Sequence, residues 1–285
     1  MIRAAILDVD GVIVGDRAGF NFPDPHPEVI AALQAVRAKG VCVSLCTAKP
    51  AFAIEKLIRD AHLDNLHITD GGAVLIDPLE HKIGAVHAIP RDIAARVVSQ
   101  YRQQGVYQEF YTADDYYIPD GDQCELTLQH ARTLQRDPRL VPDLDDFLAT
   151  ESLVKLFLVA QDTVEKEAVA ASFAEKFGEM LTLSWSIHPV MLPWQFGIVT
   201  AQGVSKRHGA EEVARYSGVA LADILGVGDT GHDWQFMELC GSVATVGNAT
   251  SELKAHVQSR KEHGMVGPGV NENGIITIFE HYGLL

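Results

Sequence analysis

The sequence predicts an α/β protein: a Rossmann-like, doubly wound parallel sheet forms a core that carries an inserted α+β domain. Strand and helix patterns alternate near both ends of the chain, which is typical of a parallel sheet covered by helices on both faces. Between residues 79 and 190 this alternation stops and strands outnumber helices. We therefore expect a discontinuous core domain over residues 1–78 and 191–285, with the insertion over residues 79–190.

The elements of the first core segment follow the order strand, helix, strand, helix and a pair of short strands. Gly40 follows the first helix pattern as a C-terminal cap, and Pro50 suits the first turn of the second helix. The expected elements cover residues 4–14 (strand and loop), 26–40 (helix), 41–48 (strand), 50–63 (helix) and 67–76 (two strands around a Gly-Gly turn).

The insertion carries a strand or hairpin rich in Asp and Tyr at residues 107–118, and residues 136–151 resemble a surface loop. Its other expected elements are strands at 81–89, 152–160 and 181–189 and helices at 91–105, 123–135 and 163–178. The last core segment returns to alternation, with helices at 205–218, 232–241 and 249–257, strands at 223–229 and 242–247, and a closing segment at 274–285.

Composition and charge exclude several classes of function. The chain has 285 residues, 47% hydrophobic and 21% charged, and its net charge is −15. Such an acidic protein is unsuited to nucleic acid or an anionic membrane as its main partner, and no apolar run reaches the length of a membrane span. Acidic residues interrupt the N-terminal apolar stretch, so it is not a signal peptide, and we expect a cytoplasmic protein. Cys42 and Cys46 are expected to be buried thiols rather than a disulfide.

Two carboxylates stand at the end of the first apolar strand, where Asp8 and Asp10 precede Gly11 in ILDVDGV. Ligands of open α/β sheets bind at the carboxyl ends of the strands. Two like charges buried side by side need a neutralising cation, and Mg²⁺ with oxygen ligands suits them. A pair of turn-capping aspartates is an equally ordinary interpretation, because D-x-D is a common pattern.

Thr47 and Lys206 have comparable positions in later elements. Thr47 ends the second strand, where its hydroxyl and the backbone N–H groups after it can hold an anion, although threonine is also an ordinary helix cap. Lys206 lies just inside a helix, where its ammonium group is either solvated or directed at a phosphate.

The stretch LGVGDTGHDWQF, residues 225–236, supports two interpretations. Its three glycines match the G-x-G-x-x-G loop of dinucleotide-binding proteins. Asp229, however, follows the second glycine, where the backbone should approach a pyrophosphate, and a carboxylate there repels phosphates unless a metal intervenes. Asp229 and Asp233 therefore favour a metal site.

Taken in order, D-x-D, Thr, Lys and G-D-x-x-x-D resemble the motifs of haloacid dehalogenase (HAD) superfamily phosphatases. The resemblance is closest to the Cof-like subgroup, in which an α/β cap is inserted between the Thr and Lys motifs. It extends over nearly the whole chain and includes ITDGGAVL before the insertion, GVSK after it, and VGNATSELKAHV followed by NENGI near the end. Under this resemblance the insertion is the cap that selects the substrate.

The resemblance implies a Mg²⁺-dependent phosphomonoester hydrolase that forms an aspartyl-phosphate and acts on a small phosphorylated metabolite such as a sugar phosphate. Asp8 is then the nucleophile, and Asp10 is the general acid that later acts as base. The implied Mg²⁺ ligands are the carboxylates of Asp8 and Asp229 and the backbone carbonyl of Asp10.

The remaining motif residues receive supporting roles from the same resemblance. Asp233 holds a water of the metal or supports Lys206. Lys206 and Thr47 bind the phosphoryl oxygens, assisted by backbone N–H groups near Gly11 and Ala48.

Three departures from the family pattern are visible: Val12 replaces a frequent Thr, residues 47–49 read TAK rather than TGR, and His232 replaces an Asn. His232 either contacts the phosphate or the leaving group, or only fills the space. In the cap, the stretch WSIHPVMLPWQF (residues 185–196) is a candidate to line the cleft through His188 and Trp194. The Asp/Tyr hairpin is better interpreted as solvated with a buried tyrosine face.

Other functions stay open on the sequence alone. A phosphotransferase or phosphomutase could use the same core, and a phosphate-binding module could have lost catalysis. An oxidoreductase that uses a dinucleotide would leave the paired aspartates, Thr47 and Lys206 unexplained. We expect a monomer or a small homo-oligomer.

Overall fold

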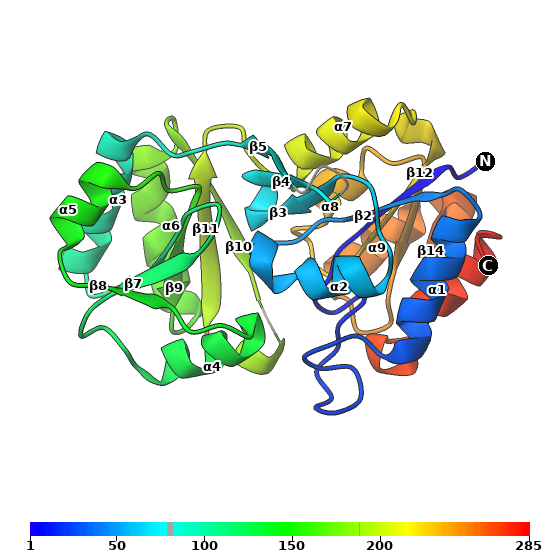
Figure 1. Cartoon of the computed structure of the whole chain (residues 1–285), viewed down its shortest axis with the longest axis horizontal. Coiled ribbons are helices and arrows are strands. Elements are labelled where there is room, and N and C mark those ends of the chain that lie inside the picture. The colour runs from blue at the N-terminus through cyan, green and yellow to red at the C-terminus, as the bar shows by residue number, and fades with distance from the viewer. Residues whose placement is uncertain (79–81, 188) are drawn as a thin grey trace.

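The protein has two lobes that lie side by side, and Figure 1 shows both chain termini in the same lobe. The computed structural model describes residues 1–78, 82–187 and 189–285. The lobe with the termini contains a parallel five-stranded sheet of order β14-β13-β12-β1-β2, and the other contains a six-stranded sheet. The predicted fold class, a doubly wound parallel core with an inserted α+β part, is confirmed.

The parallel sheet aligns the ends of β1 and of its two neighbours, β12 and β2. Ala4 in β1 pairs with Ile224 on one side and with Cys42 on the other, so these strands end at the same edge. Strand β1 is fully buried because it is apolar throughout and helices cover the sheet. The strands are β1 (Ala4–Leu7), β2 (Cys42–Leu45), β12 (Ile224–Gly228), β13 (Ser242–Thr245) and β14 (Gly264–Val266).

Helices of the core lobe pack in neighbouring pairs, with α1 beside α10 and α7 beside α8. Gly40, with a φ of +82°, follows α1 as expected for a C-terminal glycine. None of the described helices is both long and apolar enough to cross a membrane. The core helices are α1 (Pro27–Ala38), α2 (Glu55–Asp60), α7 (Lys206–Ser217), α8 (Trp234–Met237), α9 (Ser251–Ser259) and α10 (Gly274–His281).

Three short antiparallel strands, β3 (His67–Thr69), β4 (Val74–Asp77) and β5 (Lys82–Val86), lie at the edge of the core sheet. A parallel bridge between Cys46 and Ile68 connects this small sheet to the end of β2. Strand β5 therefore pairs with the core side of the molecule, although it follows the point where we expected the insertion to begin.

The six-stranded sheet of the second lobe has the order β10-β11-β9-β6-β7-β8, with only β7 and β8 parallel. Its strands are β6 (Tyr107–Tyr111), β7 (Tyr116–Pro119), β8 (Arg139–Val141), β9 (Lys155–Ala160), β10 (Leu181–Ser186) and β11 (Gln195–Ala201). Its helices are α3 (Arg91–Gln103), α4 (Glu125–Leu134), α5 (Leu144–Thr150) and α6 (Thr163–Phe177).

Two local predictions differ from the structure. Residues 136–151 are not a loop, because they form β8 and α5. The side chain of Asp143 accepts a hydrogen bond from the Asp146 N–H at 3.0 Å and caps α5, whose Phe147 is buried in the core of the second lobe. The helix expected over residues 232–241 is limited to α8, since the chain before it forms the loop of the acidic motif.

Strand β11 had no counterpart among the predicted elements, yet it lies inside the six-stranded sheet between β10 and β9. Because β5 belongs to the small sheet and β11 to the large one, we propose that the inserted domain lies between Val86 and Ser205 rather than over residues 79–190. The four cysteines are free thiols. Cys46 is buried as expected, whereas Cys42 is only partly buried.

Candidate active site

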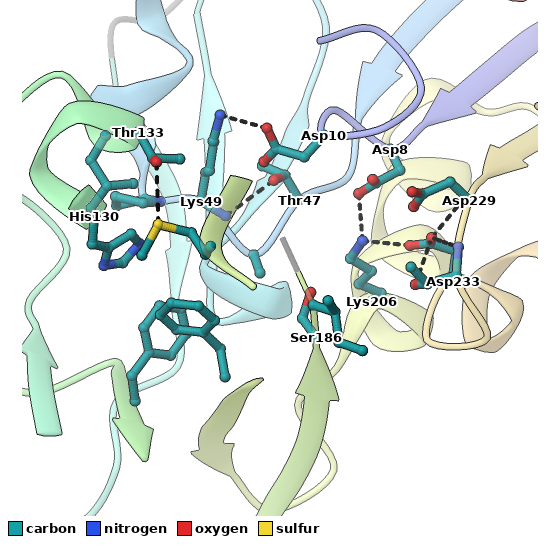
Figure 2. A pocket seen from close by; sticks show the side chains of 18 residues that line it. Asp8, Asp10, Thr47, Lys49, His130, Thr133, Ser186, Lys206, Asp229 and Asp233 are labelled. Carbon is teal, nitrogen blue, oxygen red and sulfur yellow. Dashed lines mark hydrogen bonds and ion pairs between the residues drawn. The ribbon is translucent and has the colours of Figure 1, made fainter. Parts of the chain in front are cut away.

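The predicted motif residues meet at one edge of the parallel sheet. Asp8 directly follows β1, Asp229 directly follows β12, and Thr47 lies two residues beyond the end of β2. Lys206 is the first residue of α7, which begins after the chain returns from the second lobe. Figure 2 shows these side chains around a pocket between the two lobes. The aligned strand ends bring together residues that lie far apart in the sequence.

The centre of the site is an acidic cluster held by one lysine. Carboxylate oxygens of Asp8, Asp229 and Asp233 all lie within 4.8 Å of one another, and all three residues are buried. Lys206 Nζ donates to Asp8 Oδ1 at 2.6 Å and to Asp233 Oδ1 at 2.6 Å. The other Asp233 oxygen, Oδ2, accepts from the backbone N–H groups of Asp229 and Thr230, each at 3.0 Å. Asp233 thus orients both Lys206 and the loop that carries Asp229.

The crowded carboxylates have shifted pKa values. Burial, followed by repulsion from Asp233, raises the pKa of Asp8 to about 7. Burial and the same neighbour raise the pKa of Asp229 well above its usual range. Burial also acts upward on the pKa of Asp233, but Lys206, His232 and the hydrogen bonds to Asp233 outweigh it and lower that pKa. Lys206 keeps a raised pKa because Asp233 and Asp8 outweigh its desolvation.

This cluster fits a divalent cation. Hard oxygen donors converge on one point, and the single charge of Lys206 does not neutralise three carboxylates. The pKa values of Asp8 and Asp229 are raised, so these carboxylates bind protons more readily than exposed ones do. A bound cation would supply the positive charge that these protons otherwise provide. The donor set, of oxygens alone, suits Mg²⁺.

Glycines make room for the acidic side chains. Gly11 has a φ of +82°, and a Cβ at this position would lie 2.1 Å from Asp229 Oδ2. A Cβ on Gly228 would lie 2.3 Å from the Asp233 Cβ. Gly228, one of the glycines that suggested a dinucleotide loop, thus accommodates an aspartate. The Gly11 N–H donates to Val14 O at 2.7 Å, so in this conformation that N–H is used within the turn.

The loop after β2 supplies a hydroxyl and an amine. Thr47 is buried, and its Oγ1 accepts from the Lys49 N–H at 3.1 Å, which leaves the hydroxyl proton available to a ligand. Lys49 Nζ lies 2.7 Å from Asp10 Oδ1. Sequence reasoning did not assign Lys49 to the site, although its place next to the Thr motif was a usable signal. The backbone carbonyl of Ala48 accepts from Lys155 Nζ, of the second lobe, at 2.8 Å.

His232 is separate from the pocket wall. It is not one of the described residues that line the pocket. Its Nδ1 lies 3.4 Å from Gln235 Nε2, and its Nε2 is buried without a protein partner among the described residues. Burial and the charge of Lys206 lower its pKa to about 4, so the ring is neutral near pH 7. These contacts favour the interpretation that His232 fills space.

The pocket encloses about 660 Å³ of empty space, its open mouth included. The core side contributes all the predicted motif residues except Gly11 and His232, with Lys49, Pro50 and Thr230 in addition. On the cap side, the predicted stretch 185–196 contributes residues to the pocket, whereas the residues of α4 and β9 that line it were not predicted and belong to no motif. That side is formed by His130, Thr133, Leu134, Phe157, Ser186, Ile187, Met191 and Phe196.

None of the individual cap residues suggested by the sequence is among the described residues that line the pocket. Tyr111 and Tyr116, from the Asp/Tyr hairpin, are fully buried inside the second lobe, as the favoured interpretation expected for its tyrosine face. Trp194 is half-buried and does not belong to the pocket wall that the described residues form. His188 lies outside the described residues.

Comparisons with known proteins identify the family of this chain. The sequence matches the haloacid dehalogenase-like hydrolase family over residues 5–278. The Bacillus subtilis protein YxeH is 22% identical over 93% of this chain and 96% of its own length. The 5-amino-6-(5-phospho-D-ribitylamino)uracil phosphatase YitU of Bacillus subtilis is 22% identical over 87% of each chain. A solved HAD subclass IIB sugar phosphatase shares the fold with a TM-score of 0.80, at 21% identity over 99% of this chain and 100% of its own.

Proposed function

The chain belongs to the haloacid dehalogenase-like hydrolases, and from that membership we propose that it is a Mg²⁺-dependent phosphomonoester hydrolase acting on a small phosphorylated metabolite. One observation carries the proposal: Asp8, Lys206 and the acidic cluster converge at the strand ends and open into the pocket between the lobes. This arrangement offers a nucleophile, a cation for the phosphoryl oxygens and a cation site within one cavity.

Asp8 is the nucleophile of the proposed reaction. One of its carboxylate oxygens attacks phosphorus in line, a bond from Asp8 to phosphorus forms, and the bond from phosphorus to the alcohol oxygen breaks. Asp10 donates a proton to the departing oxygen. In the second step Asp10 takes a proton from water as this water attacks the aspartyl-phosphate, and inorganic phosphate leaves with Asp8 restored.

The surrounding residues position and neutralise the phosphoryl group. Lys206, at 2.6 Å from Asp8, lies where it can contact a phosphoryl oxygen beside the nucleophile. The Thr47 hydroxyl and the backbone near Ala48 complete the phosphate site, and Lys49 positions Asp10.

The carboxylates of Asp8 and Asp229 and the backbone carbonyl of Asp10 would hold Mg²⁺, with Asp233 supporting the site through Lys206. When bound, the ion neutralises the acidic cluster and the phosphoryl charge, which lets an anionic substrate enter an acidic pocket. The relatives named above as phosphatases are consistent with this chemistry.

The test is phosphate release by the wild-type protein and by Asp8→Asn, with Mg²⁺ and with EDTA. Acetyl phosphate is a suitable first substrate because its small leaving group makes few demands on the cap. Wild type with Mg²⁺ should release phosphate, whereas Asp8→Asn should retain the circular dichroism spectrum and lose turnover, since its amide is a poor nucleophile. Turnover by Asp8→Asn at the wild-type rate would refute the proposal. Recovery of phosphorylated product in place of free phosphate would indicate transfer.

A further inference from the structure

The cap side of the pocket is aromatic. His130, Phe157 and Phe196 line it together, and their ring centroids are 5.1 Å apart for His130 and Phe196 and 5.3 Å for the two phenylalanines. Apolar side chains of Leu134 and Met191 continue the surface. Figure 2 shows His130 and Thr133 across the pocket from Asp8, Asp229 and Lys206. When the phosphoryl group of a substrate lies beside Asp8, its leaving group would therefore extend toward His130 and Thr133.

Polar atoms on this wall are few among the described residues. On the cap side, the polar side chains that line the pocket are those of His130, Thr133 and Ser186. The Thr133 hydroxyl already donates to the Gln129 carbonyl within α4, at 3.2 Å. A polyhydroxylated leaving group would therefore bury hydroxyls without partners here, which is unfavourable. An aromatic leaving group would instead pack against the aromatic rings of this wall.

His130 is held in one orientation by a buried carboxylate. Its Nδ1 lies 2.8 Å from Glu109 Oε2, and Glu109 is fully buried. Tyr111 OH donates to the same carboxylate at 2.5 Å, and Tyr107 OH contacts it at 3.3 Å. These donors favour the ionised Glu109, so Nδ1 carries the proton that faces it. The other ring nitrogen, Nε2, does not face Glu109 and is the one that a ligand in the pocket can bind.

We propose that the leaving group is a planar aromatic or heteroaromatic alcohol, stacked on Phe157 and Phe196, with a ring hydroxyl that forms a hydrogen bond with His130 Nε2. His130 is then the residue that determines specificity, and Glu109 is a positioning residue. This inference rests on the proposed phosphatase function and narrows its substrate class.

Three phosphates of primary alcohols test it: 3-hydroxybenzyl phosphate, benzyl phosphate and glucose 6-phosphate, each assayed for kcat/KM with Mg²⁺. Acetyl phosphate serves as the reference that tests the function alone. We expect 3-hydroxybenzyl phosphate to exceed benzyl phosphate by about tenfold, because its hydroxyl forms a hydrogen bond with His130 Nε2, and to exceed glucose 6-phosphate by more. Hydrolysis of acetyl phosphate with glucose 6-phosphate preferred over both aromatic esters would overturn this inference and leave the function intact. Failure with all four substrates would overturn both.

Variants locate the effect at His130. In His130→Phe the ring wall persists and the ring nitrogens are lost, so the preference for 3-hydroxybenzyl over benzyl phosphate should fall to about one. Both substrates are measured with the same variant, so a smaller amount of folded protein does not change this ratio. Leu128→Ala, on the exposed side of the same helix, should keep the wild-type ratio. An unchanged ratio in His130→Phe would contradict the assignment.

Binding provides a readout that does not need turnover. In Asp8→Asn, which should bind phosphomonoesters without hydrolysing them, calorimetry should give the same order of affinities for the three primary-alcohol phosphates. Equal affinities for the aromatic and the sugar ester would count against the aromatic wall as a recognition surface.

Discussion

At the scale of single residues, Gly11 shows how closely the acidic site is packed. Gly11 and Gly40 have the same φ of +82°, but only Gly11 faces a side chain, since a Cβ there would lie 2.1 Å from Asp229 Oδ2. Around Gly40 a Cβ would meet no atom within 4 Å. Replacing each glycine by alanine therefore distinguishes two effects. Backbone strain is common to both variants, whereas damage to the acidic site is expected only at Gly11.

Gly11→Ala should lose stability and the response to Mg²⁺ together. Gly40→Ala should cost about 1–2 kcal/mol through its left-handed backbone alone and keep the wild-type rise in Tm on adding Mg²⁺. Gly11→Ala adds displacement of Asp229, so it should cost more, and its Mg²⁺-induced rise in Tm should largely disappear. Thermal unfolding of both variants with and without Mg²⁺ measures this. An equal Mg²⁺ response in the two variants would show that Asp229 does not hold the ion.

The sequence located the motif residues because they follow strands. Asp8, Thr47 and Asp229 could be placed at one sheet edge from apolar patterns alone. The pairing of Lys49 with Asp10 could not be predicted, because it depends on the path of one long side chain. The same limit applies to His232, whose surroundings become visible only once the loop before α8 is folded.

At the scale of elements, strand β9 reaches the core through its first residue. Lys155 and Asp70 are both fully buried, with Nζ at 2.8 Å from Asp70 Oδ1, and the same ammonium group donates to the carbonyl of Ala48 in the phosphate loop. It also lies 3.7 Å from the centre of the Tyr111 ring. Burial lowers the pKa of Lys155 and raises that of Asp70, so each charge depends on the other.

A double-mutant cycle should reveal this dependence. Lys155→Met leaves the Asp70 carboxylate buried and uncompensated, which should cost about 3–5 kcal/mol. Asp70→Asn keeps a residue that tolerates the positive φ of 53° at this position. The double variant should recover about 2 kcal/mol relative to the sum of the single losses. Urea unfolding at neutral pH supplies the four stabilities, and strictly additive losses would show that the pair is not coupled.

Elements with regular patterns were predictable, and short ones were not. The helices α3, α4 and α6 of the insertion and the strands β1 and β2 follow clear patterns. Strand β8 has three residues, and α5 begins among aspartates that resemble a loop until Phe147 and Leu148 are seen to be buried. Strand β11 follows the turn around Met191, and its pairing with β9 and β10 is a tertiary contact that local pattern does not encode.

At the scale of the whole molecule, the pocket exists only between the lobes. The core side could be anticipated from motifs, whereas the cap side is assembled from β9, β10, β11, α4 and the chain between β10 and β11. No spacing in the sequence brings His130 close to Phe196, because their contact depends on how α4 packs on the sheet. The chemistry of the reaction was therefore more predictable than the shape of the leaving group.

The acidic cluster should couple the stability of the whole protein to pH and to Mg²⁺. Burial raises the pKa of Asp8 to about 7, and burial also raises the pKa of Asp229. Between about pH 4 and pH 7 the folded protein thus holds protons that the unfolded chain has already released. Without metal, the contribution of these two carboxylates to stability falls as pH rises through this window, because unfolding lets them ionise. The buried rings of His67 and His232, whose pKa values are lowered to about 3 and to about 4, make an opposing contribution below about pH 6.5.

Mg²⁺ should reverse that loss where the carboxylates are ionised. The ion competes with the protons on Asp8 and Asp229, so its stabilising effect should be small near about pH 5 and large near about pH 8. At about 100 times its Kd, a ligand that binds only the folded state adds about 2.7 kcal/mol. Thermal unfolding at constant ionic strength, with Mg²⁺ or with EDTA, measures the difference. Asp229→Asn, which lacks one of the two raised carboxylates, should show a weak Mg²⁺ response that changes less with pH. A Mg²⁺ effect that is equal at both pH values would mean that the ion binds away from these carboxylates.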